Sequence, residues 1–160
     1  MLIQVSESLG RSLAFTYDAL ARIIKVTDPA GQPYLYGYDQ AGNLATVTYP
    51  DLAQRQYLYN EMLHVQNANA PWLLTGIVDE NRDRFATFSY DGKGRAVVTE
   101  HAGGVDRYQF IYVGTWPAVT TVVTDPLGTQ RTSDYSYLNS RSTKPALSQP
   151  CLACGDITAP

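Results

Sequence analysis

A tyrosine followed by an acidic or amide residue recurs along this chain and constrains how it can fold. The first three such pairs begin at Tyr17, Tyr38 and Tyr59, so each lies 21 residues after the one before it, and a fourth begins at Tyr90. An aromatic residue stands two positions before each of these tyrosines. Self-similarity at a fixed period of about 20 to 50 residues is typical of repeat architectures. The chain is therefore predicted to consist of consecutive units that bury their apolar faces mainly against one another.

The repeated pattern extends five residues beyond each tyrosine, where arginine, asparagine or histidine stands, preceded by glycine in two units. The signature residues are Tyr17, Asp18, Arg22, Tyr38, Asp39, Gly42, Asn43, Tyr59, Asn60, Tyr90, Asp91, Gly94 and Arg95. The acidic residues could form a row of ligands for sugars or cations, or they could accept hydrogen bonds from backbone amides two or three residues on. Because Asn60 can make the same bond, we interpret the signature residues as structural.

Alternating apolar and polar residues predict an all-β fold. Tyr34, Tyr36 and Tyr38 would share one face of a strand, and similar aromatic pairs and triplets recur in the later units. Turn-forming residues separate these runs, as in the segments 28–31 and 91–94. The one helix candidate, residues 60–67, fits the register of the third repeat. We therefore expect about a dozen short strands joined as consecutive antiparallel β-hairpins.

The expected organisation has three parts. Residues 1–9 form an N-terminal lead-in strand, residues 10–137 form the repeat array, and residues 138–160 form a Ser/Thr/Pro-rich linker or an incomplete repeat. The units of the array are centred on Tyr17, Tyr38, Tyr59, Tyr90, Tyr112 and Tyr135.

Charge and hydropathy exclude several classes of function. The net charge of −3 argues against general nucleic-acid binding, which needs a basic surface. The chain has no run of 18 apolar residues that could span a membrane. Its first residues lack the basic and apolar regions of a signal peptide. Localisation therefore stays open at this point.

Three segments resemble the YD repeats of the bacterial Rhs family, namely residues 15–22, 37–44 and 89–96. The turn segments 27–31 and 124–128 are similar to the family's turns between strands, and the resemblance covers residues 10–137. It implies a curved or spiralling β-sheet wound into a shell, which encloses a toxin or presents an adhesive outer surface. It also implies a secreted or cell-surface location.

The resemblance favours a non-catalytic structural segment of a shell that encapsulates or delivers a toxin or effector, with neighbouring YD repeats of a longer chain as its partners. The alternative is a cell-surface adhesive or carbohydrate-binding module. In that case exposed aromatic residues, including Trp72 and Trp116, could stack on sugar rings. The same aromatic residues could equally serve only to pack adjacent strands together.

Few residues indicate chemistry. Cys151 and Cys154 form a C-x-x-C motif, which could be two inert thiols, a local disulfide, half of a metal site or a redox pair. The sequence shows no Gly-x-Ser-x-Gly, no His-Glu-x-x-His and no phosphate-binding glycine loop. We therefore expect neither catalysis nor a cofactor.

Overall fold

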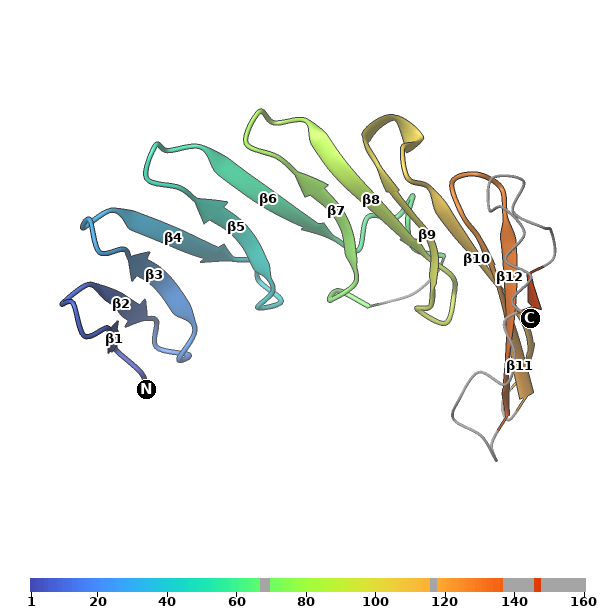
Figure 1. The fold of residues 1–160 in the computed structure, drawn as a ribbon, viewed down its shortest axis with the longest axis horizontal. Helices are drawn as coiled ribbons and strands as arrows, with labels where there is room; N and C mark the ends of the chain where they lie inside the picture. Colours follow the sequence, from blue (N-terminus) through green and yellow to red (C-terminus); the bar gives the residue numbers. More distant parts are fainter. Residues whose placement is uncertain (67–69, 116–117, 137–145, 148–160) are drawn as a thin grey trace, which may run out of the picture.

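In a computed structural model, which describes residues 1–66, 70–115, 118–136 and 146–147, the chain forms one open sheet (Figure 1). The sheet has 13 strands, which lie side by side in sequence order. They are β1 (Gln4–Ser6), β2 (Ser12–Tyr17), β3 (Ile23–Thr27), β4 (Pro33–Tyr38), β5 (Leu44–Thr48), β6 (Gln54–Tyr59), β7 (Leu74–Val78), β8 (Arg84–Tyr90), β9 (Ala96–His101), β10 (Tyr108–Thr115), β11 (Ala118–Thr124), β12 (Gln130–Ser136) and β13 (Ala146–Leu147). Every neighbouring pair is antiparallel, so the predicted all-β array of consecutive hairpins is confirmed.

The sheet bends into an arch, with the N-terminus at one foot and the C-terminal strands at the other (Figure 1). The turns that follow β2, β4 and β8 lie along the inner edge of the arch, and these are the turns that contain the Tyr-Asp pairs. The turns that follow β3, β5 and β7 lie along the outer edge. Within the described residues, no helix is long and apolar enough to cross a membrane.

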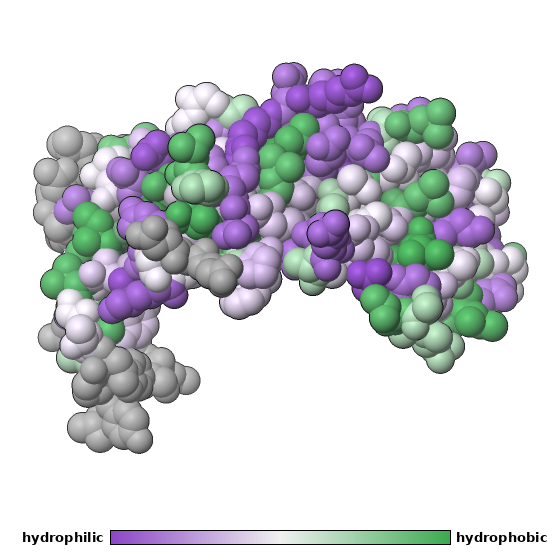
Figure 2. Space-filling model, turned by 180° about the vertical axis from the view of Figure 1, so that it is seen from behind, coloured by the Kyte–Doolittle hydropathy of each residue, from purple (hydrophilic) through white to green (hydrophobic). Residues whose placement is uncertain are grey.

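Because the sheet is a single layer, the described residues bury very few side chains. The buried ones are Val47, Val65, Ala70, Thr75 and Ala86. Figure 2 shows apolar groups scattered among polar ones on the visible face rather than one continuous apolar surface. The stability of this sheet therefore depends on contacts between adjacent strands more than on a shared core.

The third unit carries an insertion between β6 and β7 that pairs with the end of β8. Residues 62–64 form a turn, and Val65 forms a parallel bridge with Tyr90. The amide of Tyr90 donates to the carbonyl of His64 at 2.7 Å, and the amide of Gln66 donates to the carbonyl of Tyr90 at 3.1 Å. The helix considered for residues 60–67 does not form where the structure describes them, because this segment pairs with the sheet instead. The only helical element in the described part of the chain is the 3₁₀ turn η1 (Ala102–Gly104).

The first and last strands of the sheet lie in the outer two of the three expected parts. β1 lies within residues 1–9 and β13 within residues 138–160, and the division itself stays a prediction. β13 pairs with β12 through two residue pairs.

Candidate functional site

The inner-edge turns are five-residue turns closed by the aspartate of each Tyr-Asp pair. The carboxylate Oδ1 of Asp18 accepts hydrogen bonds from the amides of Leu20 and Arg22, both at 2.9 Å. Asp91 accepts equivalent bonds from Lys93 and Arg95, both at 2.9 Å. The amides bonded lie two and four residues after the aspartate, whereas the sequence suggested two or three. The side chain thus replaces a missing partner for backbone groups inside the turn.

The same turn geometry occurs along the outer edge, where no tyrosine precedes the aspartate. Asp28, Asp79 and Asp125 each accept bonds from the amides two and four residues later, at 2.8–3.0 Å. The aspartate therefore marks a turn at either edge. The tyrosine and the residue five positions after it are what distinguish the inner edge.

A β-bulge lies beside each signature tyrosine of the first four units. In the first unit Thr16 pairs with Lys25 while Tyr17 pairs with Ile23, so Ile24 is an extra residue. The corresponding extra residues in the next three units are Ala45, Thr75 and Val97. A bulge interrupts the hydrogen-bond ladder and bends the strand that contains it.

The tyrosine hydroxyl of each following unit bonds to the backbone next to that bulge. Tyr38 Oη donates to the carbonyl of Ile23 at 2.7 Å, the residue that pairs with Tyr17 and precedes the bulge. The equivalent bonds are Tyr17 to Leu2 at 2.6 Å, Tyr59 to Leu44 at 3.0 Å, Tyr90 to Leu74 at 2.8 Å and Tyr112 to Ala96 at 2.8 Å. We call these five bonds the tyrosine clamps. Sequence reasoning missed the clamps. Each tyrosine lies 15 or 16 residues after the residue whose carbonyl it binds, and this nearly fixed spacing is a signal that could have indicated them.

The arginine of the signature links its own turn to the next unit. Arg22 forms an ion pair with Asp18 at 2.8 Å, and its guanidinium lies 4.3 Å from the ring centre of Tyr38. Arg95 repeats this arrangement, with an ion pair to Asp91 at 2.6 Å and the same 4.3 Å distance to the ring of Tyr112. A guanidinium over a tyrosine ring is attractive and also covers the ring from water.

Asn43 takes the place of arginine in the second unit. Its Nδ2 donates to Asp39 Oδ2 and to the carbonyl of Pro71, both at 2.9 Å. Asn43 therefore connects the second unit to the insertion of the third, where an arginine would have reached the next tyrosine.

The third unit differs from the sequence interpretation at Asn60. Asn60 Oδ1 is buried and accepts no hydrogen bond from any described residue, and φ of Asn60 is 51°. The amide of Asn60 instead bonds to the carbonyl of Leu73 at 3.0 Å, which closes the insertion. The substitution of asparagine for aspartate therefore does not preserve the turn, because the chain at this point leaves the five-residue geometry.

A partly buried ion pair between Glu61 and Arg84 takes the place of the missing turn. Glu61 binds the guanidinium of Arg84 through both carboxylate oxygens, at 2.9 and 2.8 Å, and accepts a bond from Thr75 Oγ1 at 2.8 Å. Thr75 is fully buried. Gly76 leaves room for this network, because a Cβ at that position would lie 2.4 Å from Arg84 Nη2. The hydrogen bonds from Arg84 have the largest effect on Glu61 and lower its pKa. Burial acts to raise this pKa, but the bonds from Arg84 and Thr75 together outweigh it.

The titration of the turn carboxylates follows from their partners. A backbone bond from Arg22 lowers the pKa of Asp18, and a side-chain bond from Asn43 lowers that of Asp39. Burial acts to raise the pKa of Asp91, but the bonds from Arg95 outweigh it and the pKa is lowered. Burial raises the pKa values of the clamp tyrosines Tyr59, Tyr90 and Tyr112.

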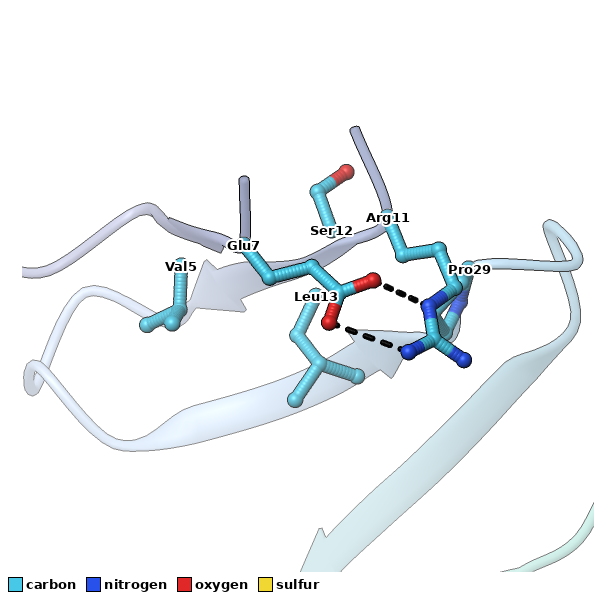
Figure 3. A pocket seen from close by; sticks show the side chains of 6 residues that line it. All are labelled: Val5, Glu7, Arg11, Ser12, Leu13 and Pro29. Atoms are coloured by element: carbon cyan, nitrogen blue, oxygen red, sulfur yellow. Dashed lines mark hydrogen bonds and ion pairs between the residues drawn. The ribbon is translucent and has the colours of Figure 1, made fainter. Parts of the chain in front are cut away.

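Three shallow surface hollows lie beside the outer turns, and another lies at the paired ends of β10 and β11. Figure 3 shows one of about 230 Å³ near the N-terminus, in which Val5 and Leu13 lie next to Glu7 and Arg11. Glu7 and Arg11, its only titratable lining residues, are paired with each other (Figure 3). A second hollow of about 510 Å³ is lined by Tyr34, Tyr49, Pro50, Asp51, Ala53 and Glu80.

The remaining sequence candidates fall into two groups. Trp72 lies in a turn of the third-unit insertion and is 67% exposed. Trp116, Cys151 and Cys154 lie outside the described residues. Among the residues that the structure does describe, no cluster of three or more His, Cys, Asp or Glu side chains could hold a metal ion.

Comparison with known families gives one match. A family model described as RHS Repeat matches residues 1–32 and again residues 22–53. Both ends of the second match lie 21 residues after those of the first, which is the spacing of the tyrosine pairs. A comparison with curated proteins found no match.

Proposed function

Because this chain belongs to the RHS-repeat proteins, we propose that it is a non-catalytic structural segment of an RHS shell that encapsulates or delivers a toxin or effector. RHS repeats are structural repeats, so the recognised role of this segment is to build and to continue a sheet. The enclosed cargo and the location outside the cell are the proposed part.

The observation that carries the proposal is the arrangement of bonds between units. Four tyrosine clamps, from Tyr38, Tyr59, Tyr90 and Tyr112, connect a unit to the preceding one, and the clamp of Tyr17 bonds to Leu2 before the first unit. Two arginines connect their units to the following one through the rings of two of these tyrosines. Bonds that draw units together along one edge favour a sheet that keeps curving as units are added, which is what a hollow shell requires.

Protection of a cargo from protease tests the proposal. The intact polypeptide that carries this segment would be digested, and its cargo region would be followed by mass spectrometry. We expect the cargo region to survive under conditions that degrade the same region expressed alone. Equal rates of degradation for the two would contradict encapsulation. The same polypeptide with Leu127→Ser serves as the matched control for protein preparation and folding, because Leu127 lies in a turn and is 92% exposed.

A carbohydrate-binding surface is the second candidate, and the exposure of Trp72 favours it. A large aromatic side chain that is 67% exposed in a turn is available to stack on a sugar ring. Binding of glycans to the chain on an array, lost in Trp72→Ala and kept in Leu127→Ala, would support this function. A glycan array without specific binding would contradict the carbohydrate-binding surface and leave the shell as the proposed function.

A further inference from the structure

The outer turn between β5 and β6 differs from three other outer turns in the residue that begins it. That residue is an aspartate at positions 28, 79 and 125, but it is Tyr49 here, 21 residues after Asp28. The amide of Tyr49 donates to the carbonyl of Ala53 at 2.9 Å, which closes the turn. Asp51 supplies the carboxylate instead, since its Oδ1 accepts the amide of Ala53 at 3.0 Å. The turn therefore forms without using the side chain of Tyr49, which is left for contacts outside it.

The ring of Tyr49 lies against the ring of Tyr34 at the start of β4. Their centroids are 6.1 Å apart and the rings meet edge to face, at an angle of 81°. Both tyrosines are half-buried. An edge-to-face pair brings the positive edge of one ring to the negative face of the other and leaves further ring faces open to a third group.

These two tyrosines line the hollow of about 510 Å³, which has a counterpart one repeat earlier. The counterpart is the hollow of Figure 3, because Pro29 lines that one and Pro50, 21 residues later, lines this one. The earlier hollow measures only about 230 Å³, has no aromatic lining residue, and has its carboxylate, Glu7, paired with Arg11. The later hollow is thus larger and aromatic at the same place in the repeat, and its volume is in the usual range for small ligands.

The two carboxylates of the later hollow differ in their partners. Glu80 forms an ion pair with Arg55 at 3.0 Å and accepts a hydrogen bond from Tyr49. Asp51 is exposed, and within the described residues it has no ion pair and no bond to its Oδ2. The hollow therefore combines an unpaired carboxylate with two aromatic rings.

We propose that this hollow, which we call the tyrosine hollow (Tyr34, Tyr49, Pro50, Asp51, Ala53 and Glu80), binds a quaternary ammonium group, either free or carried by a lipid. A cation over a tyrosine ring is attracted by the negative charge of the ring face. The carboxylate of Asp51 adds a second attraction. This inference goes beyond the proposed function and does not rest on it.

The lining favours a methylated cation over a primary ammonium. A primary ammonium has three hydrogen-bond donors to satisfy, and Glu80 is already engaged by Arg55 and Tyr49. A quaternary ammonium donates no hydrogen bond and presents its charge through methyl groups. Pro50 and Ala53 offer apolar contacts to those methyl groups beside the two rings.

A titration with choline chloride tests the proposal on the full 160-residue chain. NMR spectroscopy at constant ionic strength would follow the tyrosine ring signals, with Tyr34 and Tyr49 identified from variants that lack them. We expect saturable shifts of these two signals. The neutral analogue of choline in which a carbon atom replaces the nitrogen should bind at least about tenfold more weakly, because it keeps the shape and loses the charge.

Three variants locate the site. Tyr49→Asp gives this turn the aspartate of the other three, so the fold should persist; we expect binding to weaken about fivefold or more, although negative charge is added. Asp51→Asn can still accept the amide of Ala53 and should weaken binding about twofold to fivefold, with a smaller effect at high salt. Tyr135→Leu removes a tyrosine of β12 that is 40% exposed and should leave binding unchanged.

Vesicles distinguish the two sources of the ammonium group. Sedimentation of the chain with phosphatidylcholine vesicles but not with phosphatidylglycerol vesicles, lost in Tyr49→Asp, would assign the group to a lipid headgroup. Binding of choline without sedimentation would assign it to a free ligand.

Four results would overturn the proposal. They are the absence of saturable shifts at Tyr34 and Tyr49 with choline, equal binding of the neutral analogue, unchanged binding in Tyr49→Asp, and saturation by galactose with no response to choline. The last result would make the hollow a sugar site. The cargo-protection experiment has a separate readout, so its failure would leave the ammonium site standing.

Discussion

At the residue scale, the tyrosine hydroxyl of one unit bonds to the backbone of the preceding unit at an irregularity in its strand pairing. The bulge beside each signature tyrosine interrupts the backbone ladder, and the hydroxyl of the following unit bonds to the carbonyl at that point. A phenylalanine would supply the same ring to the sheet but not this bond. The requirement for tyrosine at these positions thus comes from the backbone of the preceding unit.

Removal of one clamp should have a measurable cost. For Tyr90→Phe, which leaves the carbonyl of Leu74 without its donor, we expect the free energy of unfolding to fall by about 1 kcal/mol. Tyr36→Phe is the matched control, because the Tyr36 hydroxyl forms no hydrogen bond with the described residues. Urea denaturation followed by circular dichroism would measure both. An equal effect of the two substitutions would show that the hydroxyl contributes nothing specific.

Asn60 shows where residue-level sequence reasoning fails. Asparagine and aspartate are similar in a list of turn-forming residues, yet Asn60 leaves the five-residue turn and its side-chain oxygen is buried without a partner among the described residues. The determinant is the chain that follows, since Glu61, Thr75 and Arg84 form a network across 23 residues. A contact over that separation has no signature in a local pattern.

At the element scale, the turns are the elements whose backbone geometry recurs most closely from one repeat to the next. Each five-residue turn has its fourth residue in the left-handed region, where φ is positive. Glycine fills this place at positions such as 31, 42 and 94, but Ala21, Leu52 and Arg82 also occupy it, with φ of 63°, 69° and 71°. Residues with a Cβ are strained in this region.

Relief of that strain should stabilise the sheet. For Leu52→Gly, we expect a gain of a few tenths to about 1 kcal/mol in the free energy of unfolding, because Leu52 is 82% exposed and loses little packing. Leu20→Gly is the control, since Leu20 is an exposed turn leucine outside the positive-φ residues. Here glycine only adds flexibility to the unfolded chain, and stability should not rise. Stabilisation by both changes in thermal unfolding would rule out the strain as the cause.

The turn carboxylates should make the sheet sensitive to acid. Asp18, Asp39, Asp91 and Glu61 all have pKa values lowered by their hydrogen bonds in the folded chain. Their contribution is therefore complete above the unfolded pKa of about 4, and it is lost as the pH falls through the lower folded values.

Thermal unfolding between pH 7 and pH 2 measures this dependence. We expect the melting temperature to be nearly constant above about pH 5 and to fall below it. Asp91→Asn should flatten the acid limb, because the amide cannot be protonated there. Asp83→Asn is the control, since the Asp83 side chain forms no hydrogen bond with the described residues. A fall in stability on the alkaline side of pH 5 instead would contradict this account.

At the scale of the whole molecule, the sequence predicted the all-β class and the consecutive hairpins, because the alternation of Tyr34, Tyr36 and Tyr38 and the regular turns are local signals. It did not predict the tyrosine clamps or the pairing of Val65 with Tyr90. Both join segments of adjacent units, and their geometry depends on how far the sheet bends. The match to RHS repeats adds independent support for residues 1–53, where the period is most regular.

A sheet whose strands contact only their sequence neighbours should lose structure locally. The described strands form neighbouring pairs throughout, and no second layer connects β2 with β8. In such an array, stability is approximately a sum over units and the interfaces between them. A defect in one unit should therefore weaken that unit and its neighbours and leave distant ones nearly unchanged.

Hydrogen exchange of Asp91→Ala tests this expectation, because the change removes the amide bonds to Lys93 and Arg95 and the ion pair with Arg95. Without that ion pair Arg95 is no longer held over Tyr112, so the effect should reach the next unit. We expect faster exchange in β8, β9 and β10 and unchanged exchange in β2 to β4. Asp28→Ala is the converse control, which should accelerate exchange in β3 and β4 and spare β8 to β10. Uniform acceleration across all strands in either variant would mean that the sheet unfolds as one cooperative body, and stability would then have to come from contacts other than those between adjacent strands.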